Sequence, residues 1–152
     1  MEGFSSLKDT DREILLKLSD KELIKTCSLN KYLFRFVCDD NFFRRKLLLS
    51  YPDTLKYFNR EKDKNYKNYY LKVVLYVAKL SEDFNFIYVS GNPEAHYDII
   101  KRVSKEIVKD GKKQFLINYQ ELLYASSKRG EIGLMEEAIK KGADIHGEND
   151  MH

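Results

Sequence analysis

Few side chains in this chain of 152 residues have types and spacing suited to chemistry: it has two cysteines, three histidines and no tryptophan. Cys27 and Cys38 lack the CxxC spacing and the neighbouring histidines that are typical of a zinc site. His96, His146 and His152 are scattered, and none stands in a pattern that is typical of a catalytic triad. We therefore expect no catalytic residue, no metal and no cofactor, and we expect both cysteines to be free thiols buried in a helical core.

The composition is that of a soluble globular protein, with 43% hydrophobic and 34% charged residues. The net charge of +3 is too small to indicate nucleic-acid binding by itself. The basic run from Arg60 to Lys67, next to Tyr66, Tyr69 and Tyr70, keeps a weakly basic nucleic-acid-binding protein as an alternative. No apolar run reaches 18 residues and the N-terminus has no signal-peptide pattern, so we expect a cytoplasmic or nuclear protein without membrane contact.

The stretch from Glu13 to Leu47 contains several short amphipathic helices within few residues. These helices present more apolar side chains than so short a segment could bury alone, so we expect them to contact the rest of the fold or a partner protein. Capping boxes are predicted at Thr10 with Glu13 and at Ser19 with Glu22, and a further cap at the Asp39-Asp40 step. A third helix is predicted over residues 31–37. Apolar faces of these four helices are predicted at Ile14, Leu15 and Leu18; at Leu23, Ile24 and Cys27; at Leu33, Phe36 and Val37; and at Phe42, Phe43, Leu47 and Leu48.

In this register the stretch resembles an F-box, the helical motif by which substrate receptors of SCF-type ubiquitin ligases dock onto the ligase's adaptor subunit. The Glu-Ile-Leu of that motif meets Glu13, Ile14 and Leu15, and its closing Asp-Asp meets Asp39 and Asp40. The resemblance implies an adaptor-binding role for Leu7, Glu13, Ile14, Leu15, Leu18, Leu23 and Ile24. The alternative is an ordinary helical subdomain whose apolar stripes face its own core.

The middle of the chain, residues 51–113, has a less legible pattern. Apolar and aromatic residues at spacings of three and four predict a buried helix from Asn65 to Leu80. Phe84 to Ser90 alternates as a short strand would, with an extended loop as the alternative. Asn92-Pro93 predicts the start of a helix that runs through Ile107 and ends near Gly111.

The C-terminal residues resemble one degenerate ankyrin repeat, with a pair of small residues, a turn glycine and a closing Gly-Ala-Asp-Ile. The resemblance implies two antiparallel helices and assigns the signature to Leu123, Ser126, Ser127, Gly130, Gly142, Ala143 and Asp144. Since one repeat cannot bury its faces alone, we expect it to pack on the Pro93 helix. No second copy is clear upstream, and the stretch from Asp98 to Gly111 is only a candidate for the second helix of a diverged repeat.

Together these patterns predict a mainly α fold, with at most a short strand near residues 84–90. The predicted parts are an F-box-like region at residues 7–50, a helical middle at 51–113 and an ankyrin repeat at 114–150. F-box-like starts joined to such repeats resemble proteins of large DNA viruses of amoebae, which implies a viral effector of host–virus interaction. We expect a non-enzymatic protein–protein interaction module that binds a ubiquitin-ligase adaptor and a host or viral target. The alternatives are an ankyrin-type binder without a ligase link and the weakly basic nucleic-acid-binding protein named above. In each case the exposed solenoid end is a candidate surface for a homodimer.

Overall fold

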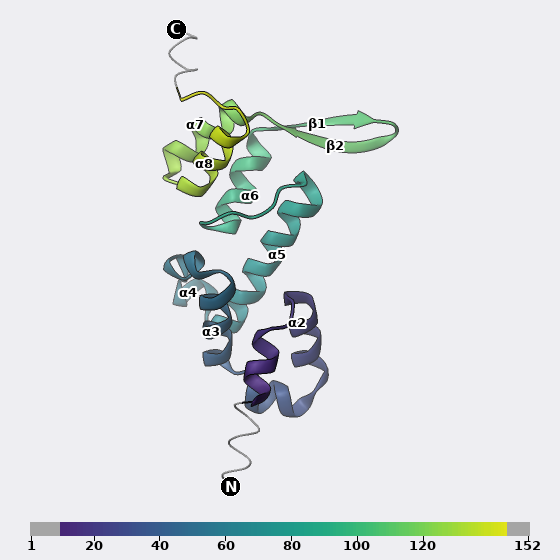
Figure 1. The fold of residues 1–152 in the computed structure, drawn as a ribbon, viewed down its shortest axis with the longest axis vertical. Coiled ribbons are helices and arrows are strands. Elements are labelled where there is room, and N and C mark those ends of the chain that lie inside the picture. Colours follow the sequence, from purple (N-terminus) through teal and green to yellow (C-terminus); the bar gives the residue numbers. More distant parts are fainter. Residues whose placement is uncertain (1–9, 146–152) are drawn as a thin grey trace. The chain divides into compact units, whose positions relative to one another are not determined.

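The computed structural model describes residues 10–145, which are mainly helical with one antiparallel pair of strands (Figure 1). The chain divides into two compact units, Met1–Val74 and Leu75–His152. The division falls inside helix α5 (Tyr66–Phe84), within the predicted middle segment. None of the described helices is long and apolar enough to cross a membrane. The mainly helical class predicted from the sequence is confirmed.

The first described element of the N-terminal unit is a helix through residues 10–16. Its other elements are α2 (Asp20–Leu29), the π-helical turn η1 (Leu33–Val37), α3 (Asp40–Ser50), the 3₁₀ turn η2 (Pro52–Tyr57), α4 (Arg60–Asp63) and the first part of α5. Two predicted caps are confirmed: Ser19 Oγ accepts from the Glu22 amide at 3.3 Å, and Asp39 Oδ1 from the Phe42 amide at 2.9 Å. Thr10 is already helical, so it is not the cap that the sequence predicts.

Polar side chains connect the helices of the N-terminal unit, one of them exposed and one buried. Asp40 Oδ1 accepts from the Tyr66 amide at 2.7 Å, so one predicted cap residue also caps α5. Lys46 is 4% exposed, and its Nζ donates to the Leu16 and Leu18 carbonyl oxygens at 3.0 Å each. A cation is thereby placed at the C-terminal end of the first helix, where the orphan carbonyls and the helix dipole favour it.

The apolar core of the N-terminal unit combines all of its longer helices. Its buried members are Leu15, Leu16, Leu23, Cys27, Val37, Cys38, Phe42, Phe43, Leu47, Tyr69, Tyr70 and Val73. The expectation of two free thiols was wrong, because Cys27 and Cys38 are disulfide-bonded, with Cα atoms 6.1 Å apart. The π-helical turn returns the chain to α2, so that the two cysteines meet in the core.

The C-terminal unit continues α5 to Phe84 and then follows an extended segment to α6 (Pro93–Arg102). A hairpin of β1 (Ser104–Lys109) and β2 (Lys112–Ile117) follows, and then α7 (Tyr119–Arg129) and α8 (Ile132–Lys140). The strand predicted near 84–90 is absent: Phe84 ends α5, and residues 85–90 form the extended loop given as the alternative. The helix predicted to run to Gly111 ends at Arg102, so no second repeat helix spans 98–111.

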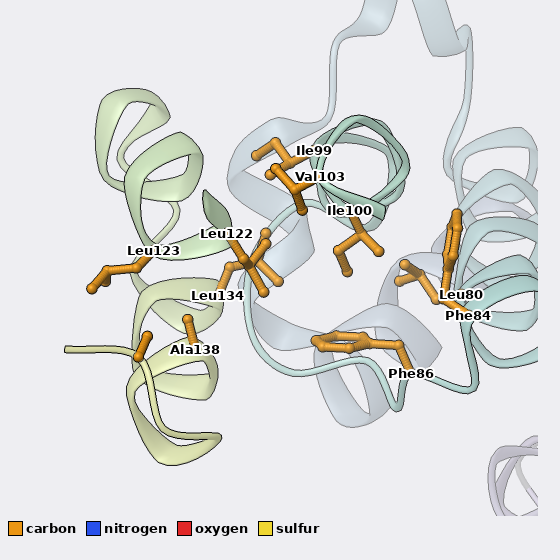
Figure 2. Close-up of a cluster of buried hydrophobic side chains, with 11 residues drawn as sticks. Leu80, Phe84, Phe86, Ile99, Ile100, Val103, Leu122, Leu123, Leu134 and Ala138 are labelled. Carbon is orange, nitrogen blue, oxygen red and sulfur yellow. The ribbon is translucent and has the colours of Figure 1, made fainter. Parts of the chain in front are cut away.

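The core of the C-terminal unit lies where the extended segment, α6 and the last two helices meet (Figure 2). Leu80 and Phe84 of α5, Ile100 of α6, Leu122 of α7 and Leu134 of α8 all point into it, and Phe86 of the extended segment covers one side. The predicted packing of the C-terminal helices on the Pro93 helix is therefore present within this unit. Asn92 caps α6 by accepting from the Glu94 amide at 3.1 Å, which confirms that predicted start.

Candidate functional site

The residues assigned to adaptor binding do not form one exposed surface. Leu15 and Leu23 are 5% and 0% exposed, so their side chains belong to the core of the N-terminal unit. Ile14 is 57% exposed. Leu18 and Ile24 are half-buried, and Leu7 lies outside the described residues. A partner meeting this region would therefore contact Ile14 first, while Leu15 and Leu23 act by holding the helices in place.

Glu13, the acidic residue of the F-box-like start, is exposed and paired within its own unit. Its Oε1 accepts from Arg45 Nη2 of α3 at 2.7 Å. Both side chains are more than half exposed, so the pair contributes well under 1 kcal/mol to stability, on the order of other surface ion pairs. It does orient the helix that carries Ile14 relative to α3.

An open depression of about 570 Å³ lies at the C-terminal end of α2 and along η1. Its lining comes from Ser28, Lys31, Tyr32, Phe34, Arg35 and Phe36. Phe34 and Phe36 are 52% and 46% exposed, although Phe36 was predicted on an apolar helix face. The sequence reasoning missed this groove, and the signal for it is the short alternation of aromatic and cationic residues from Lys31 to Phe36.

The residues of the ankyrin-like signature lie on two antiparallel helices, α7 and α8, joined at Gly130. Gly130 closes α7 with a φ of 70°, a left-handed conformation that favours glycine. Ser126 is fully buried and its Oγ donates to the Leu122 carbonyl at 2.6 Å, whereas Ser127 is exposed. Leu123 is buried at 8% exposure.

Two hydrogen bonds between the side chain of Gln120 and the backbone of Asp144 connect the end of this helical pair to the start of α7. Gln120 Nε2 donates to the Asp144 carbonyl at 2.8 Å, and the Asp144 amide donates to Gln120 Oε1 at 3.0 Å. Gly142 has a φ of 106°, and Ala143 is buried. The Asp144 side chain is exposed. The signature residues therefore shape a helix pair, and we identify no binding groove among them.

The β-hairpin extends away from α6 and α7 (Figure 1) and has two different faces. On one face Phe115 contacts the Phe84 ring, with centroids 5.2 Å apart, and Lys113 pairs with Glu106 at 3.6 Å. The other face carries no acidic residue, and its members are Lys105, Ile107, Lys109, Lys112, Gln114 and Leu116. The hairpin gives the C-terminal unit an exposed basic surface at a place where the sequence predicts the end of a helix.

A buried imidazole and a buried carboxylate meet between α6 and the start of α8. His96 Nε2 lies 3.4 Å from Glu131 Oε2, and the two side chains are 0% and 7% exposed. Burial lowers the pKa of His96 to about 4. Gly91 adjoins the pair, and a Cβ there would lie 2.5 Å from His96 Nε2. The pair is enclosed by the fold, so it suits a structural role better than contact with a substrate.

Among residues 10–145, no group of three or more histidine, cysteine, aspartate or glutamate side chains could hold a metal ion. No protein-family model matches the chain, and no curated protein or solved structure matches it. The F-box-like and ankyrin-like relations therefore stay predictions from residue patterns. What the geometry offers is a set of exposed apolar and basic surfaces on a helical framework.

Proposed function

We propose that this protein is a non-enzymatic protein–protein interaction module that docks a ubiquitin-ligase adaptor through its F-box-like helices. The observation that carries the proposal is Ile14, a large apolar side chain 57% exposed on a helix whose next two residues, Leu15 and Leu16, are buried. Exposed aliphatic side chains on a rigid helical frame are suited to a partner's apolar pocket. The half-buried Leu18 and Ile24 would extend the contact.

The proposed mechanism is proximity. A module that holds a target protein next to a ligase raises the effective concentration of the target there, and it needs no catalytic residue of its own. The surfaces beyond the F-box-like helices would then bind the target, a host or viral protein. In this proposal the protein is a viral effector that acts in the cytoplasm or nucleus of the host cell.

The test is calorimetric titration of the full chain with purified ligase adaptor subunit. We expect Ile14→Asp to weaken binding at least about tenfold, because a buried charge at an apolar contact is costly. Ile87→Asp is the matched control: Ile87 is 84% exposed in the C-terminal unit and has no assigned role. Circular dichroism must show unchanged helix content in both variants. Adaptor binding that survives Ile14→Asp, or that is absent from the wild type, contradicts the proposal.

A second candidate is a binding module of the ankyrin type without a ligase link. The Cys27–Cys38 bond favours it, because ubiquitin ligases work in the cytosol, where disulfides are rare. The burial of Leu15 and Leu23 favours it as well, since it removes two of the assigned contact residues from the surface. A wild-type chain that binds no ligase adaptor but does bind a target protein would support this candidate.

A further inference from the structure

The groove along η1 is large enough to receive part of a partner molecule. Its volume of about 570 Å³ lies within the range of ligand-binding clefts, and it is open to solvent. Its lining combines three aromatic rings with two cations and one serine, and none of the residues assigned to adaptor binding lines it. The groove is therefore a separate surface of the N-terminal unit.

The aromatic part of the groove is held ready for contact. Phe34 and Phe36 are each about half exposed, and the Tyr32 and Phe36 ring centroids lie 5.9 Å apart. Lys67 Nζ of α5 lies 4.0 Å from the centroid of the Phe34 ring, which is within cation–π distance and restrains that ring. Exposed aromatic rings that are already restrained lose little conformational entropy on binding.

The charge of the groove has one sign. Lys31 and Arg35 line it, Lys67 adjoins it, and no carboxylate is among its lining residues. Neither Lys31 nor Arg35 takes part in an ion pair with an acidic residue of the described range. An anionic partner would therefore meet unneutralised cations at the edge of an apolar surface.

The backbone under the groove is constrained from both sides. Asn30 Oδ1 accepts from the Leu33 amide at 3.0 Å at its start, and the Cys27–Cys38 bond joins its end to α2. Between these points the chain forms a π-helical turn, a conformation found frequently at functional sites. The arrangement directs Phe34 and Phe36 outward while Val37 enters the core.

We propose that this groove binds an acidic peptide segment of a target protein, with one large apolar or aromatic side chain seated against Phe34 and Phe36 and flanking carboxylates paired with Lys31 and Arg35. A single-stranded nucleic acid is disfavoured, because such ligands need a cationic track along several phosphates together with stacked bases. The groove instead is short and mostly apolar, and its lining includes only two cations, Lys31 and Arg35. The inference rests on the proposed role as an interaction module and names the chemistry of its target.

The test selects peptides from a displayed library of random twelve-residue sequences on the immobilised full chain. Enriched peptides should combine acidic residues with a large apolar or aromatic residue. Fluorescence anisotropy of the most enriched peptide should then show binding weakened about tenfold or more by Phe34→Ala and by Arg35→Glu. The matched controls Leu49→Ala and Lys101→Glu change exposed residues outside the groove and should leave affinity unchanged.

The two proposals fail separately. Ile14→Asp should leave peptide binding intact, and Phe34→Ala should leave adaptor binding intact. The groove proposal is overturned if no acidic peptide is enriched, or if enriched peptides bind the groove variants as tightly as the wild type. Displacement of the peptide by a ten-nucleotide oligothymidylate, together with direct binding of that oligonucleotide, would reassign the groove to nucleic acid.

Discussion

Acidification should destabilise the C-terminal unit through His96. This imidazole is fully buried on α6, and neither ring nitrogen has a hydrogen-bond partner among residues 10–145. Burial lowers the pKa of His96 to about 4, against an ordinary value of 6.5. The groups that face it are the Glu131 carboxylate, 3.4 Å from Nε2, and the Tyr88 ring, 5.7 Å away between centroids. Desolvation favours the neutral ring and Glu131 favours the charged one, and at full burial desolvation is the larger effect.

The sign follows from proton uptake. Since the folded-state pKa lies below the unfolded value, the unfolded chain binds more protons between pH 6.5 and pH 4, and acid favours unfolding. Stability is at its full value above pH 6.5 and falls as the pH falls toward 4. The difference between an unfolded-state pKa of 6.5 and a folded-state pKa of about 4 corresponds to about 3 kcal/mol of stability, of which about 2 kcal/mol is lost between pH 7 and pH 5.

Two measurements check this prediction. The ring carbon signal of His96, followed by NMR against pH and assigned by its loss in His96→Gln, should titrate well below pH 6. Urea unfolding at pH 7 and pH 5 should show the loss in the wild type and a smaller one in His96→Gln. An imidazole pKa at or above 6.5 would refute the reasoning, because it would mean that attraction to Glu131 exceeds the cost of burial.

Two further substitutions test the packing. Lys46→Met should destabilise the N-terminal unit by about 2 kcal/mol in urea unfolding, because the Leu16 and Leu18 carbonyls lose a charged donor. The control Arg44→Met changes an exposed position and should alter the stability little. Equal losses of stability in the two variants would contradict the assigned role of Lys46. Gly133→Ala should lower stability by more than about 2 kcal/mol, because its Cβ would lie 2.2 Å from the Ser90 carbonyl oxygen. A gain of stability, as helix propensity alone would give, would show that the extended segment does not pack there.

Local signals in the sequence predicted much of the fold. The cap at Ser19, the cap at Asp39, the α5 helix and the start of α6 at Pro93 depend on neighbouring residues, and each is present. Such signals act within one helical turn, where side chain and backbone are close whatever the tertiary fold. The mainly helical fold class could therefore be predicted from these local patterns of residues.

The β-hairpin shows how one periodic pattern can hide another. Ile99, Val103 and Ile107 fall at helical spacing and extended the predicted helix past its true end at Arg102. The missed signal was Asp110-Gly111, whose φ angles of 52° and 75° form a two-residue turn between Lys109 and Lys112. An Asp-Gly pair between apolar alternations is a strong sign of a hairpin, because that turn needs positive φ at both positions.

Exposure of the candidate site was the part that sequence could not supply. An α-helix over 31–37 would place Leu33, Phe36 and Val37 on one face, three and four residues apart. The structure instead forms a hydrogen bond from the Cys38 amide to the Leu33 carbonyl at 2.6 Å, five residues apart, and the wider turn removes Phe36 from the face that buries Val37. That change turns a predicted core aromatic into an exposed one. The groove along η1 therefore depends on the π-helical conformation of this turn, which tertiary contacts such as the Cys27–Cys38 bond stabilise. The residue pattern alone favours a regular α-helix, in which Phe36 would be buried and the groove would not form.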